Sequence, residues 1–184
     1  MRTLVCAIAF ATVAAAPFAR AEVVKASETG FVTQSTASVK AGPEFAWDML
    51  VQPARWWNPD HSWSLDGNNF RLEPVAGGCF CETLPGGGSV EHMRVIQAVP
   101  GKMLRMSGAL GPLQSEALDG TLTIELAPDN GATKITWTYV VGGYARYPLE
   151  DIVIPVDMVQ SEQLQRLAGL LVRGDPAPLP LPGD

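Results

Sequence analysis

The sequence predicts one α+β domain, in which a curved antiparallel sheet wraps around a single long C-terminal helix. Three observations support this fold class. Strand-like segments follow one another at short spacing through most of the chain, turn residues separate them, and the hydrophobic period becomes helical only near the C-terminal end. A sheet with one apolar face needs a second layer to cover it, and one amphipathic helix can supply that layer.

The first strand is expected over residues 28–40, which are rich in Thr, Val and Ser and alternate in part. Two short helices are expected after this strand. Pro43 suits the first turn of a helix over residues 44–51, and Pro53 starts a second helical turn that extends to Trp57.

Six further strands are expected before the final helix, which makes a sheet of about seven strands. Their residues are 70–74, 79–84, 90–99, 102–109, 116–127 and 133–141. Turn residues separate them, most clearly at Pro100-Gly101 and Asn130-Gly131. In the last strand every second residue is apolar, which predicts one buried face made of Ile135, Trp137, Tyr139 and Val141.

The helical period begins near Leu149. Apolar or long side chains then recur at helical spacing, at Ile152, Val156, Val159, Gln163, Leu167 and Leu170. Because Pro155 interrupts the pattern, the main helix is expected over residues 155–172. Residues 173–184 are rich in proline and are expected to form an extended tail.

The first 21 residues have the pattern of a secretory signal peptide. Arg2 supplies the positive start, residues 4–16 form an apolar run, and Ala19-Arg20-Ala21 is a cleavage site. A membrane-spanning helix needs about 20 apolar residues, so this run is too short. We therefore expect cleavage after Ala21, a periplasmic or secreted protein without stable membrane insertion, and a lead of residues 22–27 before a domain of residues 28–172.

The charge of the chain excludes two classes of partner. The net charge is −6, and it becomes −8 when the signal peptide, which holds Arg2 and Arg20 and no acidic residue, is removed. Nucleic acids and anionic membrane surfaces are bound through basic patches. We therefore expect neither as a partner.

Several motifs between residues 28 and 172 carry a family resemblance. They are VKAGPEFAWDML, PARWWNPDHSW, GGCFCE, the hairpin VEHMRVIQAVPGKMLRMSG and the hairpin GTLTIELAPDNGATKITWTYVVGG, followed by the final helix. Together they resemble the SRPBCC superfamily of START-like, helix-grip proteins, and within it the exported members similar to polyketide cyclases/dehydrases and heat-shock ATPase activators. The resemblance implies a seven-stranded sheet that grips the C-terminal helix around an apolar cavity. It implies no catalytic set, and export argues against the role of the cytoplasmic co-chaperone members.

The densest group of candidate site residues lies in residues 55–82. Three of the five tryptophans fall within eight residues there, a density typical of a tight core corner or the wall of an apolar pocket. In a helix-grip fold, core and cavity wall are nearly the same surface. The candidate ligand contacts are therefore Trp56, Trp57, His61, Trp63, Phe80, Glu82, Met93, Met106, Trp137 and Tyr139.

His61 and Glu82 are the candidate acid–base residues. A histidine titrates near neutral pH, and burial raises the pKa of a carboxyl group. Simpler interpretations are favoured for both: a loop histidine that binds backbone groups, and a carboxylate that points outward from its strand. His92 lies in the middle of an expected strand and is likewise expected to face solvent.

Cys79 and Cys81 would remain after cleavage, and an even pair in an exported protein suggests a disulfide. Residues i and i+2 of a regular strand have Cα atoms roughly 6.5–7 Å apart, so a bridge needs a bulge or a turn. The pair is left as a possible disulfide. Cys79, Cys81, His61 and His92 could also ligate zinc, but the paired CxxC spacing is missing. We expect no metal and no other cofactor.

Three interpretations of function stay open. The first is binding of a small hydrophobic or amphipathic ligand between sheet and helix, with His61, Glu82 and Tyr139 as polar contacts. The second is an enzyme of the cyclase, dehydrase or hydrolase type that uses the same cavity. The third is a ligand-free interaction module of the cell envelope. A pocket below about 300 Å³ would contradict the first two and favour the third. A histidine and a carboxylate within hydrogen-bond distance in a cavity would favour the second.

Overall fold

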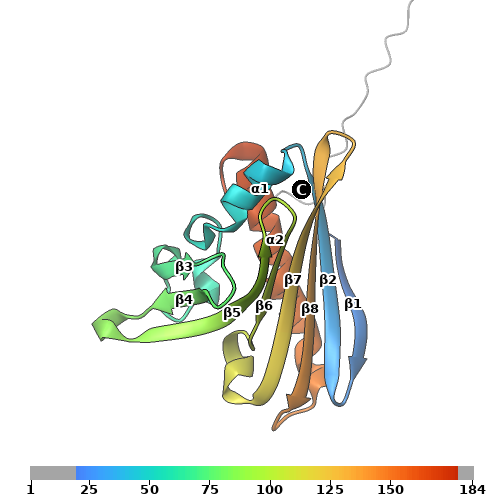
Figure 1. The fold of residues 1–184 in the computed structure, drawn as a ribbon. Coiled ribbons are helices and arrows are strands. Elements are labelled where there is room, and N and C mark those ends of the chain that lie inside the picture. The colour runs from blue at the N-terminus through green and yellow to red at the C-terminus, as the bar shows by residue number, and fades with distance from the viewer. Residues whose placement is uncertain (1–19, 178–184) are drawn as a thin grey trace, which may run out of the picture.

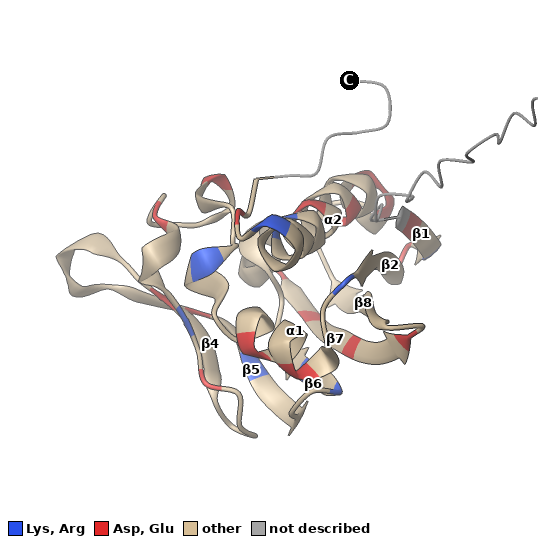
Figure 2. Cartoon of the chain, turned by 90° about the horizontal axis from the view of Figure 1, so that it is seen from above, with Lys and Arg blue, Asp and Glu red and all other residues tan. Residues whose placement is uncertain are grey.

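An eight-stranded antiparallel sheet forms one layer of the structure, and the helix α2 (Leu149–Arg173) packs against it (Figure 1). The computed structural model describes residues 20–177. Most of the expected signal peptide and residues 178–184 of the expected tail lie outside the described residues. The view in Figure 2 shows that the sheet curves around α2, as a helix-grip arrangement requires.

The sheet has the strand order β1-β2-β8-β7-β6-β5-β4-β3, with neighbouring strands antiparallel. The strands are β1 (Arg20–Ser27), β2 (Gly30–Val39), β3 (Phe70–Leu72), β4 (Cys79–Thr83), β5 (Ser89–Val99), β6 (Met103–Ser107), β7 (Ala117–Asp129) and β8 (Ala132–Tyr144).

The expected number of about seven strands is wrong by one, and the additional strand is β1. Residues 22–27, taken from the sequence as a lead before the domain, pair with β2 along most of β1. A tight turn at residues 28–29 joins the two strands, with the Ser27 hydroxyl donating to the Gly30 carbonyl at 3.0 Å. A register irregularity between Val23 and Lys25 interrupts the alternation of β1, which explains why the sequence pattern did not reveal it.

The two short helices expected after the first strand are not found in that form. One α-helix, α1 (Pro43–Leu50), follows the second strand, and the second is a single 3₁₀ turn, η1 (Pro53–Arg55). Further 3₁₀ segments are η2 (Pro59–His61), η3 (Gly67–Asn69), η4 (Pro85–Gly87) and η5 (Gly111–Ser115). Closely spaced prolines keep η1 and η2 short, because each proline removes a backbone donor and restricts the residue before it.

Helix α2 begins at Leu149, earlier than the expected start at residue 155. Pro155 lies inside the helix near its N-terminal end, so the proline does not end the helix there. Gly174 ends α2 in the left-handed conformation (φ 73°), and its N–H donates to the Leu170 carbonyl at 2.9 Å. Within residues 20–177, no helix combines the length and hydrophobicity needed to cross a membrane.

The concave face of the sheet is covered in two different ways. Helix α2 packs mainly against β1 and β2. Over the other half of the sheet, aromatic side chains occupy the space, as Trp57 lies 5.3 Å from Phe70 and 5.2 Å from Phe80 between ring centroids. Trp56 meets Trp137 of β8 edge-on at 5.9 Å. Beside this aromatic cluster lies a cavity, and residues from the first half of α2 form part of its wall.

Candidate functional site

A cavity of about 290 Å³ lies between the first half of α2, residues 57–63, the η5 segment and β5. Most of its wall is apolar and consists of Trp57, Trp63, Leu110, Gly111, Pro112, Leu113, Ile152, Pro155, Val156 and Val159. The polar residues of the wall are Asp60, His61, Ser62, His92 and Gln160. The volume is just below the range for small-molecule sites, about 300–1,000 Å³, so volume alone narrowly favours the ligand-free interaction module.

His92 enters the cavity wall because β5 has a bulge at this residue. Phe80 of β4 pairs with Met93, and Cys81 pairs with Glu91, so His92 is the additional residue between the two pairs. His92 and Met93 are consequently both buried, although they are neighbours in the strand. The prediction that His92 faces solvent is wrong, because it assumed regular alternation.

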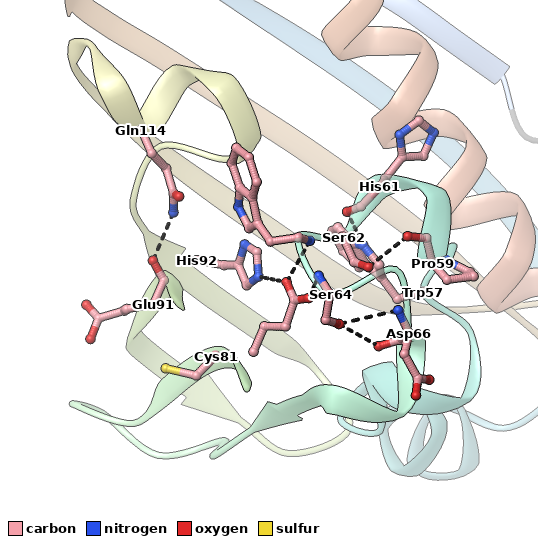
Figure 3. A network of polar contacts seen from close by, with 12 residues as sticks. Trp57, Pro59, His61, Ser62, Ser64, Asp66, Cys81, Glu91, His92 and Gln114 are labelled. Carbon is pink, nitrogen blue, oxygen red and sulfur yellow. Dashed lines mark hydrogen bonds and ion pairs between the residues drawn. The ribbon is translucent and has the colours of Figure 1, made fainter. Parts of the chain in front are cut away.

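Glu82 also points inward, contrary to the favoured interpretation, and is only 1% exposed. Three donors converge on its carboxylate (Figure 3). The backbone N–H of Trp63 donates to Oε2 at 3.1 Å, the N–H of Ser64 donates to Oε1 at 2.5 Å, and His92 Nε2 lies 2.9 Å from Oε2. These hydrogen bonds replace the water that the carboxylate loses on burial.

The electrostatics of this pair determine its protonation near neutral pH. Burial raises the pKa of Glu82, but hydrogen bonds from Ser64, Trp63 and His92 outweigh it and hold the pKa below its ordinary value of 4.5. Burial lowers the pKa of His92 below 6.5, and the carboxylate of Glu82 opposes this only in part. Glu82 is therefore ionised and His92 neutral, with its proton on Nε2, which faces the ionised acceptor.

This arrangement leaves the second ring nitrogen of His92 as a free acceptor. Among the described residues, the imidazole makes no hydrogen bond other than that with Glu82. The ring packs against Phe70 and Phe80, with centroid distances of 5.0 and 5.3 Å. Nδ1 is thus a neutral, unpaired base in a mostly apolar wall.

Gln160, another residue of the cavity wall, carries a buried polar atom without a partner. Its side chain is 3% exposed, and its Oε1 has no hydrogen-bond partner among the described residues. A buried acceptor without a partner costs about 1–3 kcal/mol, so such a group calls for a water molecule or a ligand. Other buried atoms without a partner in the same part of the chain are Trp137 Nε1, Tyr147 Oη, Asp157 Oδ1 and Gln163 Nε2.

His61 lies at the more exposed end of the cavity. Its Nε2 is 3.0 Å from Oε2 of Glu162 on α2, and both side chains are about one third exposed. The His61 carbonyl accepts a hydrogen bond from Trp57 Nε1 at 2.9 Å, while the neighbouring Trp63 is 54% exposed. His61 therefore tethers the η2 turn to α2, in contrast to the buried His92.

The structure brings only part of the expected contact set together. Trp57, His61 and Trp63 line the cavity, and Glu82 binds His92. The other expected contacts are buried but do not line the cavity: Trp56, Phe80, Met93, Met106, Trp137 and Tyr139. The Tyr139 hydroxyl is already satisfied, because it accepts from the Leu110 N–H at 3.1 Å and donates to the Gly108 carbonyl at 3.2 Å.

Sequence reasoning missed two kinds of residue that form the wall. Gln160 interrupts the apolar stripe of α2, and a polar residue in such a stripe is a signal that could have been used. The η5 segment, which contributes Leu113, and the preceding Leu110 connect two strands and have no periodicity that would place them beside α2.

The cysteines and histidines do not form one metal site. Cys79 and Cys81 are in disulfide contact, with Cα atoms 5.4 Å apart, next to the bulge in the β4–β5 pairing. Within residues 20–177, the group of three or more candidate ligand residues whose ligand atoms all lie within 4.8 Å of one another consists of these cysteines and Glu91. The structure thus does not gather the four-ligand zinc set, since His61 and His92 bind Glu162 and Glu82.

Comparison with known proteins defines the fold. No family model and no curated protein matches the chain. Solved structures similar to it include a conserved protein of unknown function, EF2215, from Enterococcus faecalis (15% identity, 90% of this chain and 82% of that chain, TM-score 0.58). CalU16 from Micromonospora echinospora is 16% identical over 91% of this chain and 88% of its own, with a TM-score of 0.55. The Aha1 dimer from Colwellia psychrerythraea is 18% identical over 77% of this chain and 96% of its own, with a TM-score of 0.56.

These likenesses support a helix-grip fold. At such identities they concern the fold alone. The cavity between α2 and the sheet, with its buried histidine and glutamate, is a feature of this chain's own residues.

Proposed function

We propose that the protein binds a small, largely apolar molecule with one or two hydrogen-bond donors in the cavity between α2 and the sheet. The observation that carries this proposal is Gln160, a residue of the cavity wall whose buried Oε1 has no partner among the described residues. A ligand donor would remove the cost of this unpaired acceptor.

The chemistry of the wall defines the ligand class. The apolar side chains would stabilise a bound molecule by about 25 cal/mol for each Å² of apolar surface removed from water. Nδ1 of neutral His92 and Oε1 of Gln160 are both acceptors, so the ligand supplies O–H or N–H groups. Asp60 lines the cavity and Glu82 lies behind His92. These carboxylates disfavour an anionic ligand.

The protein acts outside the cytoplasm in this proposal. The pattern of residues 1–21 supports export, and a Cys79–Cys81 disulfide suits an oxidising compartment. Cleavage after Ala21 would keep residues 22–27, which pair with β2, in the mature chain.

The test is calorimetric titration of the purified protein with 2-naphthol, a neutral two-ring phenol, and with 2-naphthoate as the anionic counterpart. We expect saturable binding of 2-naphthol and at least about tenfold weaker binding of 2-naphthoate, equivalent to about 1.4 kcal/mol. Val156→Trp would fill the cavity and abolish binding. Met158→Trp is the matched control, because Met158 is exposed on the same helix and does not line the cavity.

Two results would contradict the proposal. One is the absence of 2-naphthol binding to the folded protein, which would favour the ligand-free interaction module. The other is equal binding by the wild type and by Val156→Trp, which would place the ligand elsewhere. Circular dichroism of each variant establishes that it is folded before its affinity is compared.

A further inference from the structure

We infer that His92 is a general base, oriented by Glu82, and that the protein catalyses proton abstraction from a neutral carbon acid held in the cavity. This inference rests on the proposed function, since the substrate must first occupy the cavity. It concerns a step that binding alone does not require, because a binding site needs neither an ionised carboxylate behind its histidine nor a fixed imidazole tautomer.

The orientation of the imidazole is the first argument. Glu82 is held by the N–H groups of Trp63 and Ser64, so its position does not depend on His92 alone. Its Oε2 then fixes Nε2 of His92 at 2.9 Å. A base held in one orientation by a third group is the arrangement that activates histidines in acid–base catalysis.

The environment of Nδ1 is the second argument. His92 lines the cavity, and among residues 20–177 only its Nε2 has a hydrogen-bond partner. Nδ1 is not one of the buried atoms that lack a partner, so it is accessible to solvent or to a ligand. The free nitrogen is therefore available to a ligand, and the apolar wall limits the water that would compete for it.

The charges of the site fit the step. When Nδ1 takes a proton from carbon, the imidazole becomes an imidazolium, and the neighbouring Glu82 carboxylate stabilises this new positive charge. The electron pair of the broken C–H bond forms a carbon–carbon double bond, and the carbonyl π pair moves to oxygen. The side-chain amide of Gln160, on the same wall, offers an N–H donor for this oxygen.

The substrate class follows from this balance. A β,γ-unsaturated ketone gives a dienolate when Nδ1 takes its α-proton, and return of that proton from Nδ1 to the γ-carbon gives the conjugated isomer, so no oxidant, reductant or co-reactant is needed.

The titratable groups near His92 are few among the described residues. Glu82 of β4 is the charged group that contacts His92. Asp60 and His61 are the other titratable residues of the cavity wall, and His61 is paired with Glu162.

The experiment uses 5-nitrobenzisoxazole, which opens in one step when a base removes its C3 proton. The C–H pair forms the nitrile, the N–O bond breaks, and the coloured phenolate leaves. We expect the full chain to open this probe at least about 10²-fold faster than an equal concentration of free imidazole, the lower range for a positioned base. His92→Gln should fall to the rate of the imidazole-free background.

Glu82 is a positioning residue, and its test is a pH profile. Because the carboxylate favours the protonated form of His92, Glu82→Gln should move the midpoint of the rate–pH profile to lower pH and lower the plateau rate. Glu125→Gln is the matched control, since Glu125 is an exposed strand glutamate on β7, and it should leave both quantities unchanged. A purely structural role of Glu82 would not move the midpoint in a folded variant.

Quenching of tryptophan fluorescence measures probe binding separately. One outcome is that the wild type and His92→Gln both bind the probe, but the wild type opens it no faster than free imidazole does. This outcome would overturn the proton-transfer inference and leave the proposed function intact. Absence of probe binding by a protein that binds 2-naphthol would overturn the inference alone, and absence of binding of both molecules would overturn the inference and the proposed function. If His92→Gln does not fold, ¹⁵N spectra of the wild type at pH 8 determine which tautomer the His92 ring adopts. We expect the proton on Nε2, and a proton on Nδ1 would overturn the inference.

Discussion

Nε2 of His92 on β5 lies 2.9 Å from Oε2 of Glu82 on β4, and both side chains are almost completely buried. The carboxylate also accepts the backbone N–H groups of Trp63 and Ser64. One carboxylate thus connects two strands and the loop that precedes β3. The stability of this end of the sheet and the chemistry of the cavity therefore depend on the same group.

Glu82→Ala should lower the free energy of unfolding by about 3–5 kcal/mol, because it leaves His92 and two backbone donors buried without a partner. Urea denaturation at pH 7 measures the change. Glu125→Ala, an exposed glutamate on β7, should change it by less than about 0.5 kcal/mol. A loss below about 1 kcal/mol for Glu82→Ala would mean that water reaches the carboxylate in solution.

The stability of the wild type should decrease as the pH falls below about 6.5. The pKa of His92 is lower in the folded protein than its ordinary value of 6.5, so the unfolded chain binds the proton first and acid favours unfolding. Glu82, whose folded pKa lies below 4.5, adds a second decrease below that pH. Melting temperatures between pH 8 and 5 measure the first decrease, and His92→Gln should flatten it. An unchanged slope would contradict the burial of His92.

Asp157→Asn should stabilise the protein at pH 7 by about 0.5–2 kcal/mol. Asp157 is 8% exposed, its Oδ1 has no partner among the described residues, and burial raises its pKa above the ordinary value of 3.8. A raised carboxyl pKa favours folding below pH 3.8 and opposes it as the pH rises. The gain should therefore disappear near pH 3.8. Asp48→Asn, at an exposed position of α1, serves as the control and should be neutral.

Tyr139→Phe should separate a structural hydroxyl from a ligand contact. The substitution leaves the Leu110 N–H and the Gly108 carbonyl without their shared partner, at an expected cost of about 1–3 kcal/mol. Because Tyr139 does not line the cavity, the affinity for 2-naphthol should stay at the wild-type value. Denaturation and calorimetry on one preparation measure both quantities. A large loss of affinity in the folded variant would restore Tyr139 as a ligand contact.

Reduction of the Cys79–Cys81 pair should have a small effect on stability. A disulfide that closes so short a loop removes little entropy from the unfolded chain, which corresponds to about 1–2 kcal/mol. Intact-mass measurement before and after dithiothreitol should show a gain of about two mass units. If the protein kept in an oxidising buffer has the same mass before and after dithiothreitol, the two thiols are free.

The sequence predicted the parts of the fold that depend on regular periodicity. Ile135, Trp137 and Tyr139 of β8 are buried on one face, as their alternation predicts. The helical spacing of Leu167 and Leu170 likewise predicts buried positions on α2, and both are buried. These elements are regular, so the period of the sequence is also the period of the structure.

The site depends on irregular features, and these could not be predicted in the same way. A bulge at His92 has no local sequence signature, so alternation assigned this histidine to the wrong face. Glu82 points inward because backbone donors from residues 63 and 64 meet it, and these contacts cross 18 and 19 positions of the chain. The tryptophans were identified as a dense group, but only the folded chain separates Trp57 and Trp63 at the cavity from Trp56 in the core.

Because the pairing of β5 is irregular, the face of the sheet to which odd- and even-numbered residues point changes along this strand. Up to His92, the inward residues carry even numbers, whereas Met93 and Val95 carry odd ones. A second irregularity, between Val95 and Gln97 in the pairing with β6, returns Ala98 to the core. Insertion or deletion of one residue between these points would exchange polar and apolar faces over a few residues only. The strand can therefore tolerate such a change near its bulges, whereas in a regular strand the same change would move every following side chain to the opposite face.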